Sequence, residues 1–172
     1  MMLNKTLLQK KVIASHLWKY SKAEKIFILG LDSSDINDPR NGLLLAQSIE
    51  EAFDFKFVCF LDNPLTQLYT FRVLNPSLLP KQVYTADPKI QDDYNYPDTF
   101  ASLNNGILQL PQGVFPYKRV LGWHARHAMK LARSAQWITD ANYQLFLGQE
   151  SLVWKADGSH PWSSTRMSHT EK

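Results

Sequence analysis

The chain has 172 residues, of which 44% are hydrophobic and 20% are charged. This length allows one domain with a buried core, and the single cysteine excludes a small protein stapled by internal disulfides. The sequence has neither a signal-peptide pattern nor an apolar segment long enough to span a bilayer. We therefore expect a cytoplasmic protein without a membrane partner.

The formal net charge is only +3, but the charges are unevenly distributed along the chain. Residues 1–31 hold six bases and one acid, residues 32–98 hold five bases and eleven acids, and residues 99–172 hold eight bases and four acids. Blocks of opposite sign either steer a charged partner or neutralise one another in the folded state, and the sequence leaves both outcomes open.

The first predicted elements are a helix, a buried strand and a second helix. Apolar residues recur with partial helical spacing over residues 3–20, which predicts an N-terminal helix. The nearly continuous apolar run at residues 25–32 predicts a strand buried on both faces. Asp38 before Pro39 is typical of a helix start, so we expect a helix after Pro39. Its apolar stripe consists of Leu45, Ile49, Ala52 and Phe53.

A second apolar run, at residues 57–62, predicts another buried strand. The succession of strand, helix and strand favours a right-handed crossover between parallel strands. The segments that follow are expected to be a short helix at residues 65–72, short strands at 82–85 and 107–110, and a surface loop at 86–100.

The C-terminal part is predicted to contain a long helix and a hairpin. Pro116 opens a helix that we expect to end near Ile138. Residues 143–147 and 151–154 flank Gly148 and predict a β-hairpin. The expected fold is therefore α/β, a Rossmann-like three-layer arrangement with a mostly parallel sheet and a C-terminal hairpin at its edge. Residues 1–155 would form one domain, and residues 156–172 a disordered tail.

The predicted helix at residues 116–138 carries the strongest functional signal. No acidic residue lies between Asp98 and Asp140. At about 100° per residue, five cations fall in one sector of the helical wheel together with aromatic side chains. Such a face suits nucleic acid, because cations neutralise phosphates and indole rings stack on bases. The candidate binding residues are Lys118, Arg119, Trp123, Arg126, His127, Lys130, Arg133 and Trp137.

Two other interpretations of this face remain open. Long cationic side chains commonly form a solvated outer surface whose stems shield apolar neighbours. Trp and Arg are also frequent anchors at protein interfaces, so the same residues fit an adaptor or regulatory protein that docks on an acidic protein surface.

Polar residues at the ends of the two predicted strands define a different candidate site. Ligands of parallel sheets bind at the carboxyl ends of the strands, where carboxylates and hydroxyls suit a ribose or a hydrated Mg²⁺. This alternative is a small enzyme that acts on a nucleotide or sugar phosphate. Its candidate residues are Asp32, Ser33, Ser34, Asp35 and Asp62.

The sequence contains no recognisable catalytic or metal-binding motif. The seven glycines form neither a dinucleotide-binding nor a P-loop pattern. His124 and His127 have no neighbouring acid or cysteine to complete a zinc site, so a buried His124 bonded to the backbone is the simpler expectation. We expect no metal site and no cofactor, except that the enzyme alternative admits Mg²⁺. The leading hypothesis is a non-catalytic, polyanion-binding domain that binds nucleic acid or serves as an accessory subunit of a nucleic-acid-handling complex.

Overall fold

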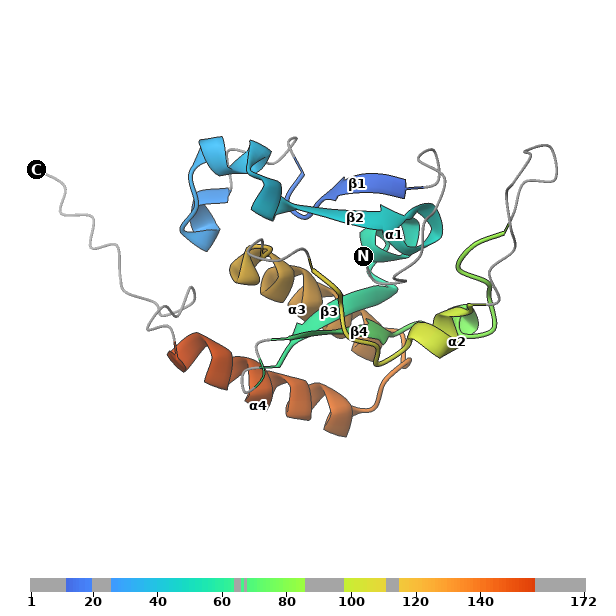
Figure 1. Ribbon diagram of the computed structural model, residues 1–172. Helices are drawn as coiled ribbons and strands as arrows, with labels where there is room; N and C mark the ends of the chain where they lie inside the picture. Colours follow the sequence, from blue (N-terminus) through green and yellow to red (C-terminus); the bar gives the residue numbers. More distant parts are fainter. Residues whose placement is uncertain are drawn as a thin grey trace, which may run out of the picture.

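The computed structural model describes residues 12–19, 26–63, 66, 68–85, 98–110 and 115–156, with side chains of the last helix described to residue 149. Within these ranges the strands form two separate antiparallel pairs, β1 with β2 and β3 with β4. In Figure 1 the two pairs lie at different levels, and helix α3 lies between the β1–β2 pair and helix α4.

The first strand pair and the helix after it form one structural unit. Strand β1 (Val12–His16) pairs with β2 (Gly42–Ala46), with His16 opposite Gly42. Helix α1 (Gln47–Asp54) follows β2 directly. The described part of the connection from β1 to β2 contains a 3-10 turn at residues 26–29 and the short 3-10 helices η3 (Ser33–Asn37) and η4 (Pro39–Asn41).

A buried asparagine holds the connection between these strands in place. The Asn41 side chain is fully buried; it accepts a hydrogen bond from the Trp18 backbone at 2.9 Å. Its amide donates to the carbonyl oxygens of Trp18 at 3.0 Å and of Ile36 at 2.9 Å. One buried side chain therefore satisfies three backbone groups.

The second strand pair joins β3 (Val58–Asp62) to β4 (Tyr69–Val73), with Asp62 opposite Tyr69. The segment after β4 contains η5 (Pro76–Leu78) and the short helix α2 (Phe100–Leu103). A single β-bridge links Thr70 to Ile107, and another links Gln82 to Thr99. Further pairing is not found within the part of the chain that the structure describes.

Helices α3 (Lys118–Ser134) and α4 (Asp140–Ala156) complete the described elements. Two apolar clusters pack against α3: Val120 and Leu121 belong to the cluster that includes Phe60 and Phe53, and Ala128 belongs to the cluster that includes Cys59. The α3 residues that are buried in this way are Val120, Leu121, His124, Ala125, Ala128, Met129 and Ala132.

The expected Rossmann-like, three-layer fold with a mostly parallel sheet is wrong. Both strand pairs in the described ranges are antiparallel and contain two strands each. The predicted strand at residues 57–62 is confirmed as β3, and the predicted helix at 116–138 is confirmed as α3. Strand β4, which follows β3, pairs with it in antiparallel orientation, so no crossover connects parallel strands in the described ranges.

The N-terminal assignments fail for identifiable reasons. Residues 12–16, within the predicted helix at 3–20, form a strand because they pair with β2 over their whole length. Residues 26–29 form a 3-10 turn instead of a strand. Ile26 and Leu29 are buried while the two residues between them are exposed, a spacing of three that is typical of a 3-10 turn.

Several other assignments also change. The expected helix at residues 65–72 is replaced at its end by β4, and the expected strands at 82–85 and 107–110 amount to one bridge each. The C-terminal hairpin expected at 143–154 is wrong, because α4 runs through both of its proposed strands. The helix predicted after Pro39 is divided: Asp38 caps η4 as expected, strand β2 follows, and α1 carries Ile49, Ala52 and Phe53 of the predicted apolar stripe as buried residues.

The predictions for residues 1–11 and for the tail beyond residue 156 fall outside the described residues. Among the helices that the structure describes, none combines the length and the apolar character that crossing a bilayer requires.

Candidate nucleic-acid interface

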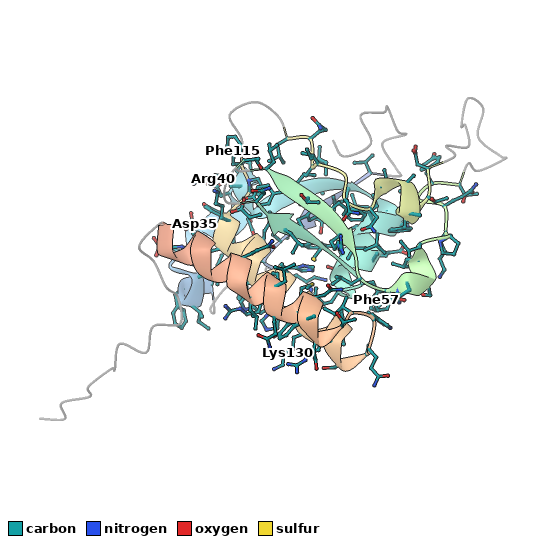
Figure 2. All side chains as sticks on the ribbon, turned by 90° about the horizontal axis from the view of Figure 1, so that it is seen from below. Asp35, Arg40, Phe57, Phe115 and Lys130 are labelled. Atoms are coloured by element: carbon teal, nitrogen blue, oxygen red, sulfur yellow. The ribbon has the colours of Figure 1, made fainter. Side chains whose placement is uncertain are left out.

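Helix α3 docks with its apolar side inward and its basic side outward. Val120, Leu121 and Ala132 are among the side chains that face the core. His127 and Lys130 are exposed, and Arg126 is half-buried between the two sides. Figure 2 shows Lys130 on the surface, far from the other end of α3, where Asp35 and Arg40 lie. The outward side of α3 is called the α3 face below; it comprises Lys118, Arg119, Trp123, Arg126, His127, Lys130 and Arg133.

Some cations of the α3 face are paired within the chain. Lys118 Nζ lies 3.7 Å from Asp62 Oδ2, which is the distance of an ion pair and not of a direct hydrogen bond. Arg133 Nε donates to Asp140 Oδ1 at 2.6 Å. The middle acidic block therefore neutralises one end of the face, and α4 supplies an acid at the other end.

Arg119 is tied to the turn at residues 26–30. Its Nη1 donates to the carbonyl oxygen of Leu29 at 3.0 Å. Gly30 has a φ of +67°, and a Cβ on Gly30 would lie 2.4 Å from Arg119 Nη1. Glycine adopts this left-handed backbone freely, and its lack of a Cβ leaves room for the guanidinium. Arg119 therefore stabilises the turn at residues 26–30, besides any contact that it makes with a partner.

Lys130 and His127 are the most accessible basic side chains near the centre of the face. The ammonium of Lys130 has no acidic partner among the described residues. The Nδ1 atom of His127 lies 2.8 Å from the carbonyl oxygen of Trp123, one turn earlier. This part of the surface can offer its charge to a phosphate without breaking an ion pair.

Both tryptophans of the predicted site pack against neighbours. The Trp123 ring meets the edge of Trp18 at a centroid distance of 4.9 Å and lies 3.9 Å from the His127 ring. The Trp137 ring meets Phe57 at 5.4 Å. Each indole is half-buried. They mainly anchor α3 to the rest of the molecule, and only their outer edges are open to a partner.

The acids of the enzyme alternative lie in two places. Asp32, Ser33, Ser34 and Asp35 are in or next to η3, where Asp35 Oδ2 accepts a hydrogen bond from the Asp32 backbone at 2.8 Å. Tyr117 donates its hydroxyl proton to Asp35 Oδ1 at 2.7 Å. The bonds from the Asp32 backbone and from Tyr117 hold the pKa of Asp35 below its usual value.

An arginine completes this polar cluster at the start of α3. Arg40 donates to both carboxylate oxygens of Asp38 at 3.0 and 2.9 Å, and these bonds lower the pKa of Asp38 to about 2. The Arg40 guanidinium lies 4.6 Å from the centre of the Tyr117 ring. Burial and the bond to Asp35 raise the pKa of Tyr117 to about 12. The carboxylates are thus occupied in fixing η3 and η4 to α3.

Asp62 stands apart from that cluster, at the end of β3. Its carboxylate oxygens and the hydroxyl of Tyr69 are buried without a hydrogen-bond partner in the described structure. Burial raises the pKa of Asp62, against the opposing effect of Lys118. Since residues 26–29 form a turn, no pair of parallel strand ends brings Asp32 and Asp62 together. The geometric premise of the enzyme alternative is therefore wrong.

His124 lies in the core, which confirms the prediction of a buried histidine bonded to the backbone. Only 2% of it is exposed, and its ring stacks on Phe53 at 3.5 Å. Its Nε2 lies 2.7 Å from the Phe53 carbonyl oxygen, so the neutral imidazole donates from Nε2. Burial lowers the pKa of His124 to about 3, because a charged ring would lose its hydration.

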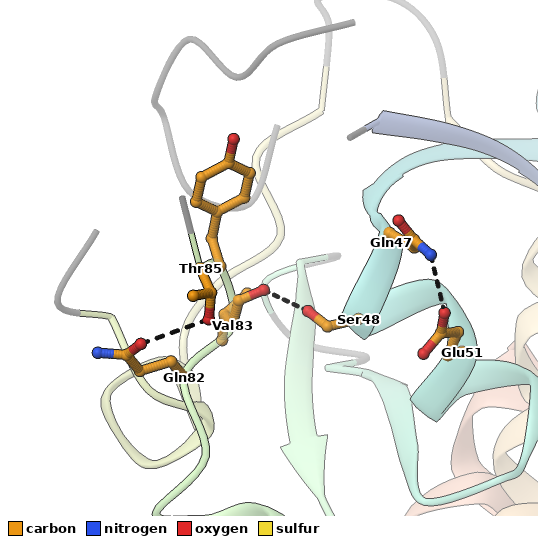
Figure 3. Close-up of a pocket in the computed structure, with 7 residues that line it drawn as sticks. Gln47, Ser48, Glu51, Gln82, Val83 and Thr85 are labelled. Atoms are coloured by element: carbon orange, nitrogen blue, oxygen red, sulfur yellow. Dashed lines mark hydrogen bonds between the residues drawn. The ribbon is translucent and has the colours of Figure 1, made fainter. Parts of the chain in front are cut away.

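Two pockets differ in the charge that they present. The pocket in Figure 3 lies at the start of α1, where the Ser48 hydroxyl donates to the Val83 carbonyl oxygen; its volume is about 200 Å³ and no basic residue lines it. A pocket of about 470 Å³ between the end of α3 and the start of α4 is lined by Lys130 and Arg133. Gln136 and Tyr143 also line it. The sequence does not indicate that these two residues line a pocket, because Tyr143 falls in a predicted hairpin strand and no sequence pattern distinguishes Gln136.

The sequence is similar to one known family over part of its length. Residues 5–60, about a third of the chain, match a family described as HNH endonuclease. The described part of this segment comprises β1, η3, η4, β2, α1 and the start of β3. No curated protein and no solved structure matches the chain.

The matched residues 5–60 contain one histidine, His16. His16 is exposed at the end of β1, and Asn41 is committed to backbone hydrogen bonds. Phosphodiester cleavage commonly uses divalent metal ions, which need several oxygen or nitrogen ligands. No group of three or more His, Cys, Asp or Glu side chains is arranged to hold a metal ion in the described ranges. The donors that the structure describes do not fit a metal site.

Proposed function

We propose that this protein binds nucleic acid through the α3 face without cutting it, as an accessory component of a nucleic-acid-handling complex. The observation that carries the proposal is the docking of α3, which buries its apolar side and turns His127 and Lys130 outward. The similarity of residues 5–60 to an HNH endonuclease family supports the same partner class.

The donor set of the matched segment favours binding over cleavage. A general base or metal ligand acts together with other groups held within reach of the same phosphate. His16 is the one histidine of this segment, and the carboxylate of Asp38, which lines the same pocket as His16, is already paired with Arg40. The Asn41 amide donates its hydrogen bonds to backbone carbonyl oxygens, so it offers no free donor to a substrate.

The proposal is tested with a fluorescently labelled oligonucleotide and charge reversal on the α3 face. Arg126→Glu combined with Lys130→Glu should weaken binding by at least tenfold at low salt, because two phosphate contacts become repulsive. Lys130→Glu alone, at an exposed position, should give a smaller loss in the same direction.

A matched control carries the same change in net charge elsewhere. Arg72→Glu combined with Lys81→Glu alters two exposed positions outside α3 and should leave the affinity within about threefold of the original. Circular dichroism confirms that each variant is folded. A folded Arg126/Lys130 variant that keeps its affinity would overturn the proposal. Wild-type protein that does not bind nucleic acid at low salt would also overturn it and would favour an acidic protein surface as the partner.

A further inference from the structure

We infer that the pocket between α3 and α4 receives an unpaired base, so that the preferred ligand is single-stranded nucleic acid. The inference rests on the proposed function, because it adds a base-binding site to the phosphate-binding face. The pocket has a volume of about 470 Å³, within the range of about 300–1,000 Å³ that small-molecule sites occupy. Lys130 belongs both to the α3 face and to the pocket wall, so a strand lying on the face passes the pocket.

The pocket wall offers flat surfaces on which a base can stack. The Arg133 guanidinium lies 5.1 Å from the centre of the Tyr143 ring, and both side chains line the pocket. Arg133 Nε donates a hydrogen bond of 2.6 Å to Asp140, which favours this position of the guanidinium beside the ring. Aromatic rings and guanidinium groups are the usual stacking surfaces for unpaired bases, and they accept any base because every base has a π-face.

A glutamine occupies a position where a glycine would be easier to accommodate. Helix α3 ends in a Schellman motif, in which the Trp137 backbone donates to the Ala132 carbonyl oxygen and the Gln136 backbone donates to that of Arg133. This motif places Gln136 at a φ of +59°, a left-handed conformation that glycine adopts freely and glutamine does not.

The strained glutamine lines the pocket, and its side chain offers two donors and an acceptor for the edge of a base. Residues with a strained backbone cluster at functional sites, and Gln136 differs from Lys56, which has a similar φ at the end of α1, in that it lines a pocket. Gln136 therefore adds hydrogen bonding to the stacking surface of Arg133 and Tyr143. Its exposure means that packing in the core does not explain the choice of residue.

The pocket distinguishes single strands from duplexes. In a duplex each base is stacked and paired, and moving it into a side pocket costs the energy of unstacking and unpairing. An unpaired base enters without that cost. The α3 face alone would bind either form through phosphates, so the pocket is the feature that predicts a preference between them.

The test compares two labelled oligonucleotides of equal length, one of thymidines and one with an abasic backbone, by fluorescence anisotropy at fixed salt. Wild-type protein should bind the thymidine strand about tenfold more tightly, which is the order of magnitude of one stacked base. Tyr143→Leu and Gln136→Gly should each bring the two affinities closer together while leaving abasic binding unchanged.

Gln136→Gly separates a base-binding role from a structural one. Relief of the left-handed strain should keep or raise the midpoint of thermal unfolding even as the preference for bases falls. Asn105→Gly is the matched control, because Asn105 has a φ of +69° and lies outside the pocket. It should leave the preference intact. Equal wild-type affinity for both oligonucleotides, or an unchanged preference in both pocket variants, overturns the inference alone. Binding of neither oligonucleotide at low salt overturns the proposed function as well.

Discussion

His124 shows how a single buried residue makes stability depend on pH. The folded state keeps its imidazole neutral, with the pKa lowered to about 3 because the ring is buried. In the unfolded chain the same ring binds a proton near its ordinary pKa of about 6.5. His124 therefore contributes full stability above about pH 6.5, and that contribution is lost progressively as the pH falls from about 6.5 toward 3.

The first prediction concerns this acid sensitivity. Stability should fall by up to about 1.4 kcal/mol for each pH unit below about 6.5, because protonation favours the unfolded chain. Urea unfolding at pH 7.0, 6.0 and 5.0 measures the loss. His124→Gln removes the titrating group and, although less stable at pH 7, should show a flatter profile in this range. An equally steep profile in that variant would assign the effect to another group.

Cys59 is protected by the same kind of burial. It lies in the apolar cluster with Ala128 and Phe146, and burial raises the pKa of its thiol to about 12. We expect the native protein to react with a thiol reagent at pH 8 at least about a hundredfold more slowly than the protein in denaturant. Because the chain has one cysteine, the reaction reports this position alone. Rapid labelling of the native protein would place the thiol at the surface.

At the scale of elements, α3 depends on small residues where it meets its neighbours. Ala125, Ala128 and Ala132 are buried in the cluster that also contains Phe146 of α4. A larger side chain at such a position must push the elements apart. The alanine spacing therefore determines how closely α3 lies to α4 and β3.

The third prediction follows from that spacing. Ala128→Leu should reduce the free energy of unfolding by about 1–3 kcal/mol through overpacking. Ala141→Leu, at an exposed position in α4, should change it by less than about 0.5 kcal/mol. Urea unfolding followed by tryptophan fluorescence compares the two. Similar stabilities would mean that the packing around Ala128 relaxes freely.

The elements that the sequence predicts well are those with a long or unambiguous pattern. Helix α3 repeats its apolar spacing over 17 residues, so its position and its outward side follow from periodicity alone. Short apolar runs are ambiguous: Ile26 to Leu29 forms a 3-10 turn, although the similar run at β3 forms a strand. The partner of each strand decides such cases, and the partner is not visible locally.

The sequence also predicts one part of the candidate site and not another. The cations of the α3 face are predictable because they share one helix. The pocket beside them is not, since it depends on how α4 packs and on the left-handed backbone of Gln136. The proximity of Asp35 to Tyr117 also escapes local patterns, because 82 residues of sequence separate them.

At the scale of the whole molecule, the opposed charge blocks partly neutralise one another. Lys19 pairs with Asp54, and Lys118 pairs with Asp62, each time joining a basic block to the acidic one. The described acids leave Lys130 unpaired. The surface available to a polyanion is therefore smaller than the sequence total of eight C-terminal bases implies.

The fourth prediction quantifies this smaller surface. With two or three cations reaching phosphates, the logarithm of the binding constant for a single strand should fall with the logarithm of the salt concentration at a slope of about −2. Anisotropy titrations between low and physiological salt give the slope. A value of about −3.5 would require all five cations of the α3 face to reach phosphates, including those that are paired within the chain.

The contacts of α3 also determine which part of the chain can fold independently. Tyr117 bonds to Asp35, Trp123 packs on Trp18, and His124 stacks on Phe53. The segment that matches a nuclease family thus takes part of its interior from a helix that begins more than fifty residues beyond it. A protein cut after residue 60 would expose those surfaces and aggregate. The helix that presents the basic residues therefore also stabilises the matched segment. Neither the matched segment nor α3 would fold if it were produced without the other.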